Sequence, residues 1–478
     1  MADRAVVDPV RVAGGEDGRM SGEQLAPGVV RLRPDDHFMI LAETDASPMY
    51  IGALLMLEAP AGGDGLYEKV RRHLAERLPA TPLQTRLVQA PDGYDSDVWA
   101  DVADPDLDHH VTPMPSAEPW REAELRTVLA RLSLERLDLQ HSPYRIFVFD
   151  RVEQGRAALY VKVHHALADG IGVQTILRLL SDAGAPSPPR TRDSEPPTEA
   201  AWRRLADARF AEEAELRDRH KAGREAALAA MDALRDNPAT RRPRTPSLRM
   251  SGRTAPQRAY ATLQLDFARV KQTAAALNGT INDLFLALCA SAVRELLIEL
   301  DDLPEAPIVI NSARSYRKPE HGAFGNRIVA LHPHIATHLA DPMERLRAIQ
   351  AEMRRELARS PLDEAMLDQP EKPFGARERR ARFAERSGEP LLPGNISLSN
   401  VPGPAEERSY AGMRLIANYP VPIIGSGRFA NITSRRNAGR LDIGVMVDPT
   451  RIPDVDGLVR GVIEALELYA GLAETAND

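Results

Sequence analysis

The chain has 478 residues, of which 43% are hydrophobic and 27% are charged, a composition typical of a globular protein rather than a disordered or fibrous one. Its formal net charge of -8 argues against nucleic acid as a partner. The chain has one cysteine, Cys289, so a disulfide framework is excluded and a reducing, cytoplasmic location is expected. Because Cys289 lies in an apolar run, we interpret it as a buried core residue.

The N-terminal segment, residues 1–29, is polar and has no apolar core of the kind a signal peptide needs. We predict that it is a disordered lead. No stretch of the chain approaches the roughly 20 apolar residues that a membrane-spanning helix requires. If the protein handles lipids, we expect it to work from a membrane surface or from solution.

Residues 30–184 mix short strands and helices and are predicted to form an N-terminal lobe. A run at 50–57 is typical of a buried strand, and the spacing of apolar residues favours helices at 64–77 and 122–134. Two further strands, 144–149 and 157–163, flank a turn at Glu153-Gln154-Gly155.

Residues 185–257 form a linker by composition, because proline clusters open and close it. Between them, residues 199–236 are rich in Ala, Arg and Glu and favour one long polar helix. Residues 241–258 contain six arginines and no acidic residue. This basic stretch is interpreted either as a solvated, mobile connection or as a segment attracted to the phosphate groups of a ligand or to an anionic membrane face.

Residues 258–478 again mix helices and strands, and are predicted to form a C-terminal lobe. Strands are expected at 261–265, 307–311, 395–400 and 441–447, and helices at 267–277, 282–300, 342–357 and from Val455. A chain of this length suits two domains. The sequence therefore predicts a two-lobed α/β molecule.

One strand ends in a motif that can carry chemistry. Leu159, Val161 and Val163 fall on one face of the strand that stops at His164-His165. Asp169 can cap a helix over residues 173–180, and the glycine after it permits a close approach. The paired histidines thus lie at a strand-to-loop junction, where a side chain can face a cleft.

This arrangement suits acyl transfer from a thioester to an alcohol, which needs a base near neutral pH. His165 can be that base while His164 holds the backbone. Asp169 could act as a base itself, but we favour a structural role in which it pairs with an arginine and fixes the loop. The alternatives are a pair of zinc ligands, disfavoured because no Cys/His cluster lies nearby, and simple packing.

The string His164-His165-Ala166-Leu167-Ala168-Asp169-Gly170 resembles the HHxxxDG motif of the CoA-dependent acyltransferase superfamily. Further segments resemble one branch, the bacterial wax ester synthase/acyl-CoA:diacylglycerol acyltransferases, in an order that extends from about residue 34 to residue 466. They are Pro34-Asp35-Asp36, Glu43, Pro48-Met49-Tyr50-Ile51-Gly52, Thr280-Ile281-Asn282-Asp283-Leu284, Gly325-Asn326-Arg327, Asn395 to Pro404, and Asn431-Ile432-Thr433.

The resemblance implies two chloramphenicol-acetyltransferase-like α/β lobes, with mixed sheets flanked by helices and an active-site tunnel between the lobes. It implies that acyl-CoA is the donor and that a hydrophobic alcohol, diacylglycerol or a long-chain alcohol, is the acceptor. The product would be triacylglycerol or wax ester. No metal and no separate cofactor are implied, and a peripheral position at the inner membrane face or on lipid inclusions is expected.

Roles for single residues follow from the resemblance by position. His165 would be the general base, His164 and Asp169 would be structural, and Gly170 would leave room for substrate. The residues expected to shape the cleft or border the tunnel are Asn282, Asp283, Ser399, Asn400 and Gly403, with Asn282 as a candidate oxyanion donor. The plain alternatives are a helix N-cap at Asn282 or Asp283 and a Pro-Gly-Pro turn after residue 401.

The chain departs from the family pattern at positions that we expect to face substrate. These are Ser142-Pro143-Tyr144-Arg145 in place of Pro-Leu-Trp, Ala313 to Arg317 without the usual proline, Tyr50 in place of histidine, and Arg435-Arg436 in place of apolar residues. They leave open an enzyme that acylates a specialised metabolite, with a carrier-protein thioester as donor. A non-catalytic lipid-binding protein is the remaining alternative.

Overall fold

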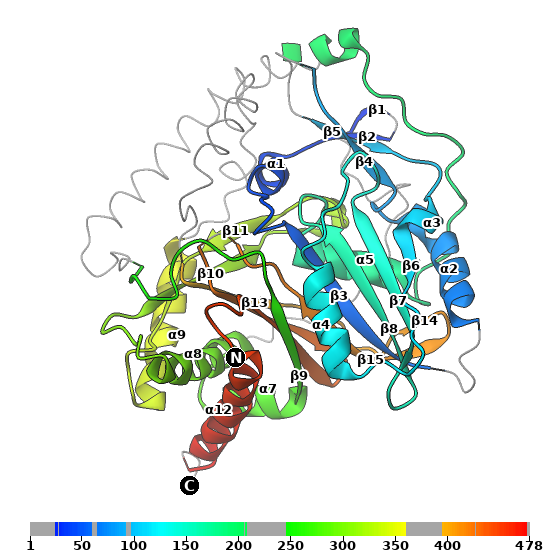
Figure 1. The fold of residues 1–478 in the computed structure, drawn as a ribbon. Coiled ribbons are helices and arrows are strands. Elements are labelled where there is room, and N and C mark those ends of the chain that lie inside the picture. The colour runs from blue at the N-terminus through cyan, green and yellow to red at the C-terminus, as the bar shows by residue number, and fades with distance from the viewer. Residues whose placement is uncertain are drawn as a thin grey trace, which may run out of the picture.

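The computed structural model describes residues 24–26, 28–59, 65–91, 97–204, 206–207, 245–359, 394–425 and 427–475. Two α/β lobes lie side by side, each built on its own mixed β-sheet (Figure 1). The predicted fold class is therefore confirmed. In the part of the chain that is described, no helix is both long enough and apolar enough to cross a membrane.

The sheet of the N-terminal lobe has the strand order β14-β15-β3-β8-β7-β6. Alternating residues of its strands enter two separate cores. Leu55 and Val161 pack with the helices on one face, whereas Leu54 and Tyr160 pack with the helix on the other. The elements are β3 (Tyr50–Glu58), β6 (Val111–Pro113), β7 (Tyr144–Val152), β8 (Arg156–His164), β14 (Ser409–Tyr410) and β15 (Met413–Val421), with α2 (Leu66–Arg77) and α5 (Gly170–Leu180) on one face and α4 (Glu122–Leu132) on the other.

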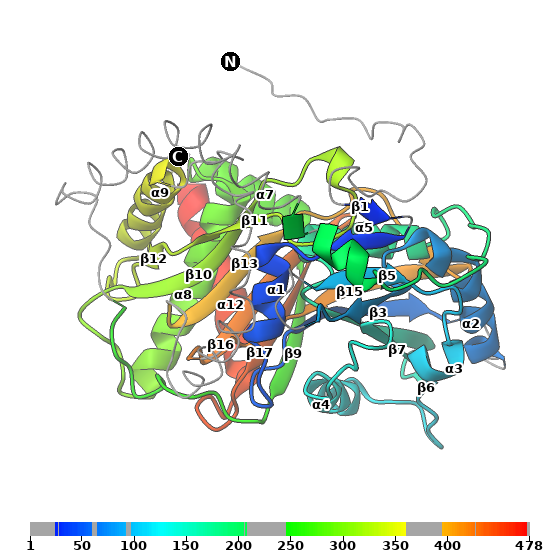
Figure 2. The same cartoon turned by 90° about the horizontal axis from the view of Figure 1, so that it is seen from above.

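The sheet of the C-terminal lobe has the order β11-β10-β13-β16-β17-β9, with β12 also paired to β10. Four helices cover one face and form the largest core (Figure 2). The strands are β9 (Ala259–Asp266), β10 (Ile308–Ser315), β11 (Ile328–Leu331), β12 (His334–Ile335), β13 (Ile396–Val401), β16 (Ala430–Asn437) and β17 (Arg440–Val447), and the helices are α7 (Phe267–Ala276), α8 (Ile281–Glu299), α9 (Pro342–Arg359) and α12 (Val455–Thr475).

A third, smaller sheet has the order β1-β2-β5-β4 and lies beside the N-terminal lobe. Its strands are β1 (Gln24–Ala26), β2 (Val29–Arg31), β4 (Thr85–Val88) and β5 (Val98–Asp101). Shorter helical segments elsewhere in the chain include α1 (Pro34–Leu41), α3 (Leu107–His110) and the single turns η1 (Leu78–Ala80) and η3 (Pro319–His321). Because residues 24–26 form β1, the expected disordered lead contributes a strand at its end. Residues 1–23 lie outside the described residues.

The predicted linker is partly packed on the lobes. Arg190 forms an ion pair with Asp101 at 2.7 Å, and Trp202 is buried with Val29 in a small core. Leu248 and Met250 lie in the basic stretch 241–258 but are buried in the C-terminal core. The interpretation of this stretch as a solvated, mobile connection is therefore wrong for these two residues. Residues 199–204 are helical as expected, while residues 208–244 lie outside the described part.

Two strands cross from the C-terminal half of the chain into the N-terminal sheet, β15 and the short β14 that pairs with it. Strand β15 pairs antiparallel with β3, so the N-terminal sheet contains strands from both sides of the predicted boundary at residue 258. The crossing brings β15 against β17, where Tyr260 donates a hydrogen bond to Pro420 O at 2.8 Å. A Cβ placed on Gly444 would lie 1.8 Å from Pro420 O, so only glycine allows this approach.

We therefore expect Gly444→Ala to weaken the junction of the lobes, because the added methyl group meets backbone that cannot move aside cheaply. Overpacking of this kind costs about 1–3 kcal/mol. The measurement is the free energy of unfolding in urea. The matched control is Gly471→Ala on the exposed side of α12, where a Cβ meets nothing within 4 Å. An equal effect of the two substitutions would contradict the tight crossing.

Candidate active site

A cavity of about 720 Å³ lies between the two main sheets. Strands β3 and β15 contribute to its wall from one sheet, and β10, β11, β13 and β16 contribute from the other. The apolar part of the wall comprises Phe38, Met39, Met49, Ile51, Ile171, Val173, Ile328, Ala330, Val401, Val421 and Ile423. The cavity thus lies where the sequence predicted a tunnel between the lobes.

His165 lies on the wall of this cavity, directly after strand β8. Its backbone is held on both sides, because its N–H donates to Met49 O at 2.8 Å and its carbonyl accepts from Asn326 Nδ2 at 2.7 Å. The ring atom Nδ1 is buried and has no hydrogen-bond partner among the described residues. Burial lowers the pKa of His165, although Asp169 acts in the opposite direction. The imidazole is therefore neutral at neutral pH, as a base must be.

The fully buried His164 does not line the cavity and instead joins a polar network with Glu43 and Tyr50. Its Nδ1 accepts a hydrogen bond from Ala166 N at 3.0 Å, so the ring proton lies on Nε2, which is 3.3 Å from Glu43 Oε2. The Tyr50 hydroxyl donates to the other oxygen of Glu43. Burial raises the pKa of Glu43, but the hydrogen bonds from His164 and Tyr50 outweigh burial, so the pKa of Glu43 is lowered. This network fixes the first histidine.

Asp169 ties together three pieces of chain. Its Oδ1 accepts from Gly172 N at 2.7 Å and caps α5, as the sequence predicted. Its Oδ2 accepts from Arg317 at 2.9 Å and from Arg327 N at 2.9 Å. Both side chains of the ion pair are almost completely buried, with 4% exposed for Arg317 and 1% for Asp169. The expected arginine partner is therefore Arg317, which the sequence alone did not single out.

A second clamp holds the loop that carries His165. Asp36 on α1 accepts hydrogen bonds from Asn326 N and Nδ2, each at 2.7 Å, and Asn326 Nδ2 also donates to His165 O. Burial raises the pKa of Asp36 to about 7, although the bonds from Asn326 lower it. The segments Pro34-Asp35-Asp36 and Gly325-Asn326-Arg327, which were identified by their resemblance to the family, therefore contact each other next to the backbone of His165.

The other predicted substrate-binding residues divide into two groups. Gly170, Ser399 and Asn400 line the cavity, whereas Gly403, Asn282 and Asp283 do not. A Cβ on Gly170 would lie 3.0 Å from Val401, so a larger residue would crowd the wall.

The second group has structural positions. A Cβ on Gly403 would lie 1.9 Å from Arg436 O, which explains a glycine there without substrate. Asp283 accepts from Thr280 N at 2.9 Å in a capping box at the start of α8. The N-cap is Thr280 rather than Asn282 or Asp283, and Asp283 takes part in capping as the N3 residue of the box. Asn282 is not among the residues that line the cavity in the described structure.

Two of the departures from the family pattern do not face the cavity, contrary to expectation. Tyr50 is buried and hydrogen-bonded to Glu43, and Tyr144 is buried with its ring stacked on His110 at 4.3 Å. Arg435, in contrast, lines the cavity together with Ala313. Of the two basic departures, Arg436 stacks on the Phe267 ring at 4.2 Å instead.

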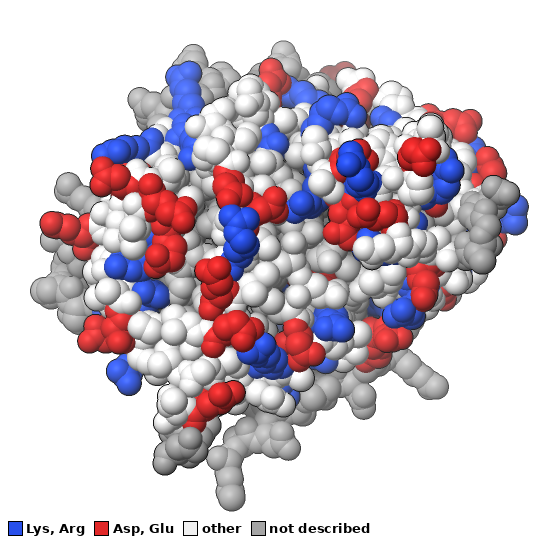
Figure 3. Space-filling model, turned by 60° about the horizontal axis from the view of Figure 1, so that its bottom comes forward, with Lys and Arg blue, Asp and Glu red and all other residues white. Residues whose placement is uncertain are grey.

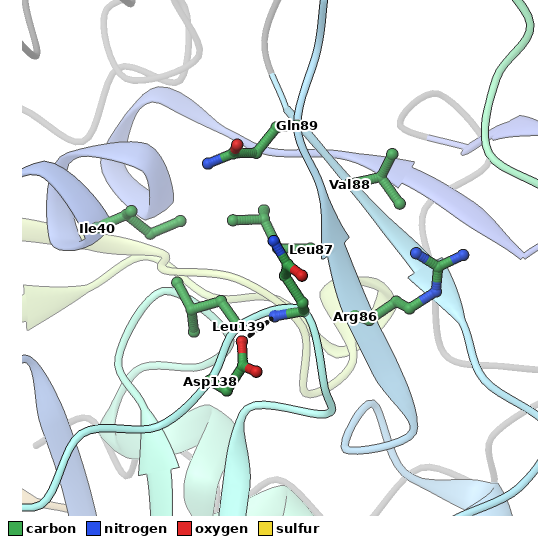
Figure 4. Close-up of a pocket in the computed structure, with 8 residues that line it drawn as sticks. Ile40, Arg86, Leu87, Val88, Gln89, Asp138 and Leu139 are labelled. Atoms are coloured by element: carbon green, nitrogen blue, oxygen red, sulfur yellow. Dashed lines mark hydrogen bonds between the residues drawn. The ribbon is translucent and has the colours of Figure 1, made fainter.

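A second cavity, of about 380 Å³, lies away from the histidines (Figure 4). Ile40 of α1, Leu87 of β4 and Leu139 surround it, and a hydrogen bond joins Asp138 to Gln140 at its edge. None of the paired histidines, Asp169 or Gly170 lines it. The acyl-transfer chemistry therefore belongs to the larger cavity.

Comparison with protein families agrees with this site. Residues 32–285 match the wax ester synthase/diacylglycerol acyltransferase catalytic domain, and residues 324–469 match the C-terminal domain of the same family. The chain belongs to this family. It is accordingly an acyltransferase, and the HHxxxDG motif lies inside the matched catalytic domain.

Individual relatives give the same result. The chain is 28% identical to a putative diacylglycerol O-acyltransferase of Mycobacterium tuberculosis over 92% of this chain and 100% of the relative. It is 30% identical to a probable diacylglycerol O-acyltransferase of the same species, over 91% and 98%.

Solved structures share the fold. The wax ester synthase/diacylglycerol acyltransferase from Marinobacter aquaeolei VT8 matches 92% of this chain and 100% of its own, with 22% identity and a TM-score of 0.63. The first condensation domain of the CDA synthetase matches 93% and 96%, with 16% identity and a TM-score of 0.56.

The Asp169–Arg317 pair makes a quantitative prediction for the family fold. Arg317→Met leaves the carboxylate of Asp169 buried without its cation, which should cost about 3–5 kcal/mol in the free energy of unfolding. In the double variant Asp169→Asn/Arg317→Met, most of that cost should disappear because the buried charge is gone. Urea unfolding of the four proteins in the cycle measures the coupling. Arg440→Met, at an exposed position, is the control and should lie within about 0.5 kcal/mol of the parent.

Proposed function

We propose that this protein transfers a fatty acyl group from acyl-CoA to the hydroxyl group of diacylglycerol or of a long-chain alcohol, giving triacylglycerol or wax ester. The observation that carries the proposal is the position of His165, a partly buried and neutral imidazole on the wall of a largely apolar cavity between the lobes. Such a cavity suits an acyl chain and a hydrophobic acceptor. The family membership supports the same reaction class.

The reaction needs one proton acceptor and one proton donor. His165 accepts the proton of the acceptor hydroxyl as the hydroxyl oxygen attacks the thioester carbonyl carbon. The tetrahedral intermediate then collapses, the C–S bond breaks, and the departing CoA sulfur takes the proton back from the His165 imidazolium. The products are the ester and free CoA, and no covalent link to the protein is formed. Because Nδ1 of His165 is buried, the nitrogen that exchanges the proton is Nε2.

The remaining motif residues position this base. His164 is held by Glu43 and Ala166, and Asp169 is occupied by Arg317 and two backbone N–H groups. An aspartate whose oxygens accept three hydrogen bonds is poorly suited to take a proton. We therefore assign Asp169 a structural role.

The cavity lining gives little support to the acylation of a specialised metabolite. Its motive was the segment from Ser142 to Arg145, yet Tyr144 is packed in the core and none of the four residues lines the cavity. An acceptor panel with palmitoyl-CoA and with carrier-bound palmitate as donors separates the two functions. Turnover of diacylglycerol or hexadecanol with palmitoyl-CoA is expected, and turnover restricted to the carrier-bound donor would sink the proposal.

The role of His165 predicts the effect of removing it and the pH dependence of the reaction. His165→Ala should lower kcat by roughly 10²–10⁴-fold, because general-base help is lost. Since burial lowers the pKa of His165, the base stays neutral further into acid, and the acid limb of kcat/KM should have its inflection below pH 6.5. Steady-state rates with hexadecanol between pH 4.5 and pH 8 test both points.

The control for this experiment is His141→Ala, because the His141 side chain is 55% exposed and lies outside the cavity lining. It should match the parent in rate and pH profile. An unchanged rate in His165→Ala would overturn the catalytic assignment and leave lipid binding as the function. An inflection at or above pH 6.5 would contradict a partly buried, neutral base.

Peripheral contact with a membrane or a lipid inclusion is a further part of the proposal, because the substrates and products are apolar. Ile298 on α8 and Ile463 and Leu468 on α12 are between 42% and 47% exposed, and these two helices pack together. On the face shown in Figure 3, acidic and basic groups are interspersed. Apolar contact is therefore a better basis for binding than a basic surface there.

Co-sedimentation with anionic liposomes at low salt tests this contact. The parent protein should pellet with the vesicles, and the double variant Ile463→Gln/Leu468→Gln should pellet several-fold less. Because both positions are exposed, folding should be unaffected. If the parent stayed in the supernatant at low salt, the membrane part of the proposal would fail.

A further inference from the structure

Arg435 is a buried cation on the wall of the apolar cavity. Strand β16 presents Asn431, Thr433 and Arg435 to the cavity, while Ile432 between them enters the helix-covered core. This alternation follows from the period of two in a strand. The Arg435 residue is only 3% exposed. A guanidinium group is expensive to bury without an anion, so its surroundings decide what it can do.

The described surroundings satisfy little of this charge. Arg435 donates from one terminal nitrogen to Asn418 Oδ1, a neutral amide oxygen, at 3.0 Å. Its Nε is buried and has no hydrogen-bond partner among the described residues. A guanidinium has five N–H donors, and the described contacts account for one.

The nearest candidate counter-ion is already occupied. Asp442 lies opposite Arg435 in the pairing of β16 and β17, but its Oδ1 accepts from Gln264 at 2.7 Å and its Oδ2 accepts from Asn418 N at 2.6 Å. Within the described ranges, no ion pair joins Asp442 to Arg435, and Asp442 attracts the guanidinium group only at longer range. Burial lowers the pKa of Arg435 to about 10, so the group still carries its charge at neutral pH.

The other charged residues of the cavity wall also favour an anionic ligand. Arg428 also lines the cavity and is 7% exposed. The acidic residues of the wall are Asp35 and Asp169, and Asp169 is engaged by Arg317. A positively charged group at the wall of a largely apolar chamber favours an anionic ligand group, since a charge-assisted bond is strengthened in a water-poor environment.

We propose that Arg435 forms an anion subsite in the cavity and that one of the two substrates carries a carboxylate that binds there. The inference rests on the proposed function and narrows its substrate class to a fatty molecule with a second, acidic end. The carboxylate could belong to the acceptor alcohol or to the acyl chain of the donor. A planar guanidinium matches a carboxylate well, whereas an uncharged substrate group at this place would leave Arg435 with only Asn418 as a hydrogen-bond partner and Asp442 at longer range.

A merely structural Arg435 is the competing explanation, since its bond to Asn418 touches the crossing strand β15. Such a role would change the rates of charged and uncharged substrates alike. The test therefore compares substrates that differ only in the carboxylate. In one arm, hexadecanol and 16-hydroxyhexadecanoate are acceptors with palmitoyl-CoA. In the other arm, hexadecanol is the acceptor, and palmitoyl-CoA is compared with its ω-carboxy analogue.

The variants are Arg435→Met and Arg435→Gln, each measured as the ratio of kcat/KM for the charged substrate to that for the uncharged one. In one arm, both variants should lower this ratio by roughly 10- to 100-fold, the strength of a hydrogen bond to a charged group. Melting curves establish that each variant is folded, and two variants guard against the failure of one. Arg436→Met is the control, because Arg436 carries the same charge on the opposite face of β16 and should leave the ratio unchanged.

The arm in which the ratio falls identifies which substrate carries the carboxylate. A ratio that is unchanged in both arms would overturn the anion subsite, while turnover of hexadecanol by the parent protein would still support the proposed function. Loss of turnover with all substrates in the parent protein would instead count against the proposed function itself. A fall in the ratio for Arg436→Met of the same size would also overturn the subsite, because it would assign the effect to general surface charge.

Discussion

The carboxylate of Asp169 is the contact on which the site depends. One oxygen caps the helix that follows the paired histidines, and the other binds Arg317 and the backbone of Arg327 from the C-terminal half of the chain. A single buried charge therefore fixes the loop after His165 and joins it to the opposite lobe. Without it, the helix start, the histidine loop and the segment around Arg327 would each lose a defined position.

The second tie between the lobes is made by backbone and amide groups. Strand β15 completes the N-terminal sheet while Asn418 and Pro420 on it contact β16, β17 and β9. Its end and the residues after it, Val421 to Ile423, also line the cavity. The cavity wall is thus assembled from strands whose relative position is set by this crossing. A change in the crossing would alter the space available to substrate even where no substrate-facing side chain is changed.

The sequence predicted much of the fold because strong periodic patterns coincide with the elements. The strand that became β8, the helix that became α8 and the helix capped by Asp169 were all found, with ends within a few residues. The motif and the family resemblance also led to His165 and Asp169. Strand β15 (Met413–Val421) is absent from the predicted strands, and a strand pattern there would in any case say nothing about which sheet receives it.

The site was less predictable than the fold, for a physical reason. Residues that touch substrate and residues that hold backbone can share the same motif, and a motif does not distinguish between them. Asn282 and Asp283 belong to a recognisable segment, yet neither lines the cavity, and Asp283 instead bonds the N-cap residue Thr280 in a capping box. Arg317 and Asn326 belong to segments that were compared with the family pattern. Their partners Asp169 and Asp36, however, are 148 and 290 residues away in sequence. Such pairings arise only when the chain is folded.

The crossing of β15 has a consequence for how the protein is made. A ribosome releases residues 30–184 long before it reaches Met413, so the N-terminal sheet emerges with the edge of β3 open. That edge exposes unpaired backbone N–H and C=O groups for as long as synthesis of the intervening chain takes. The sheet of the nascent N-terminal lobe therefore stays incomplete until β15 has been synthesised. During this time the open edge of β3 can pair with other chains. Protection of this edge by chaperones, or a slow step at its closure, would set the yield of folded enzyme in the cell.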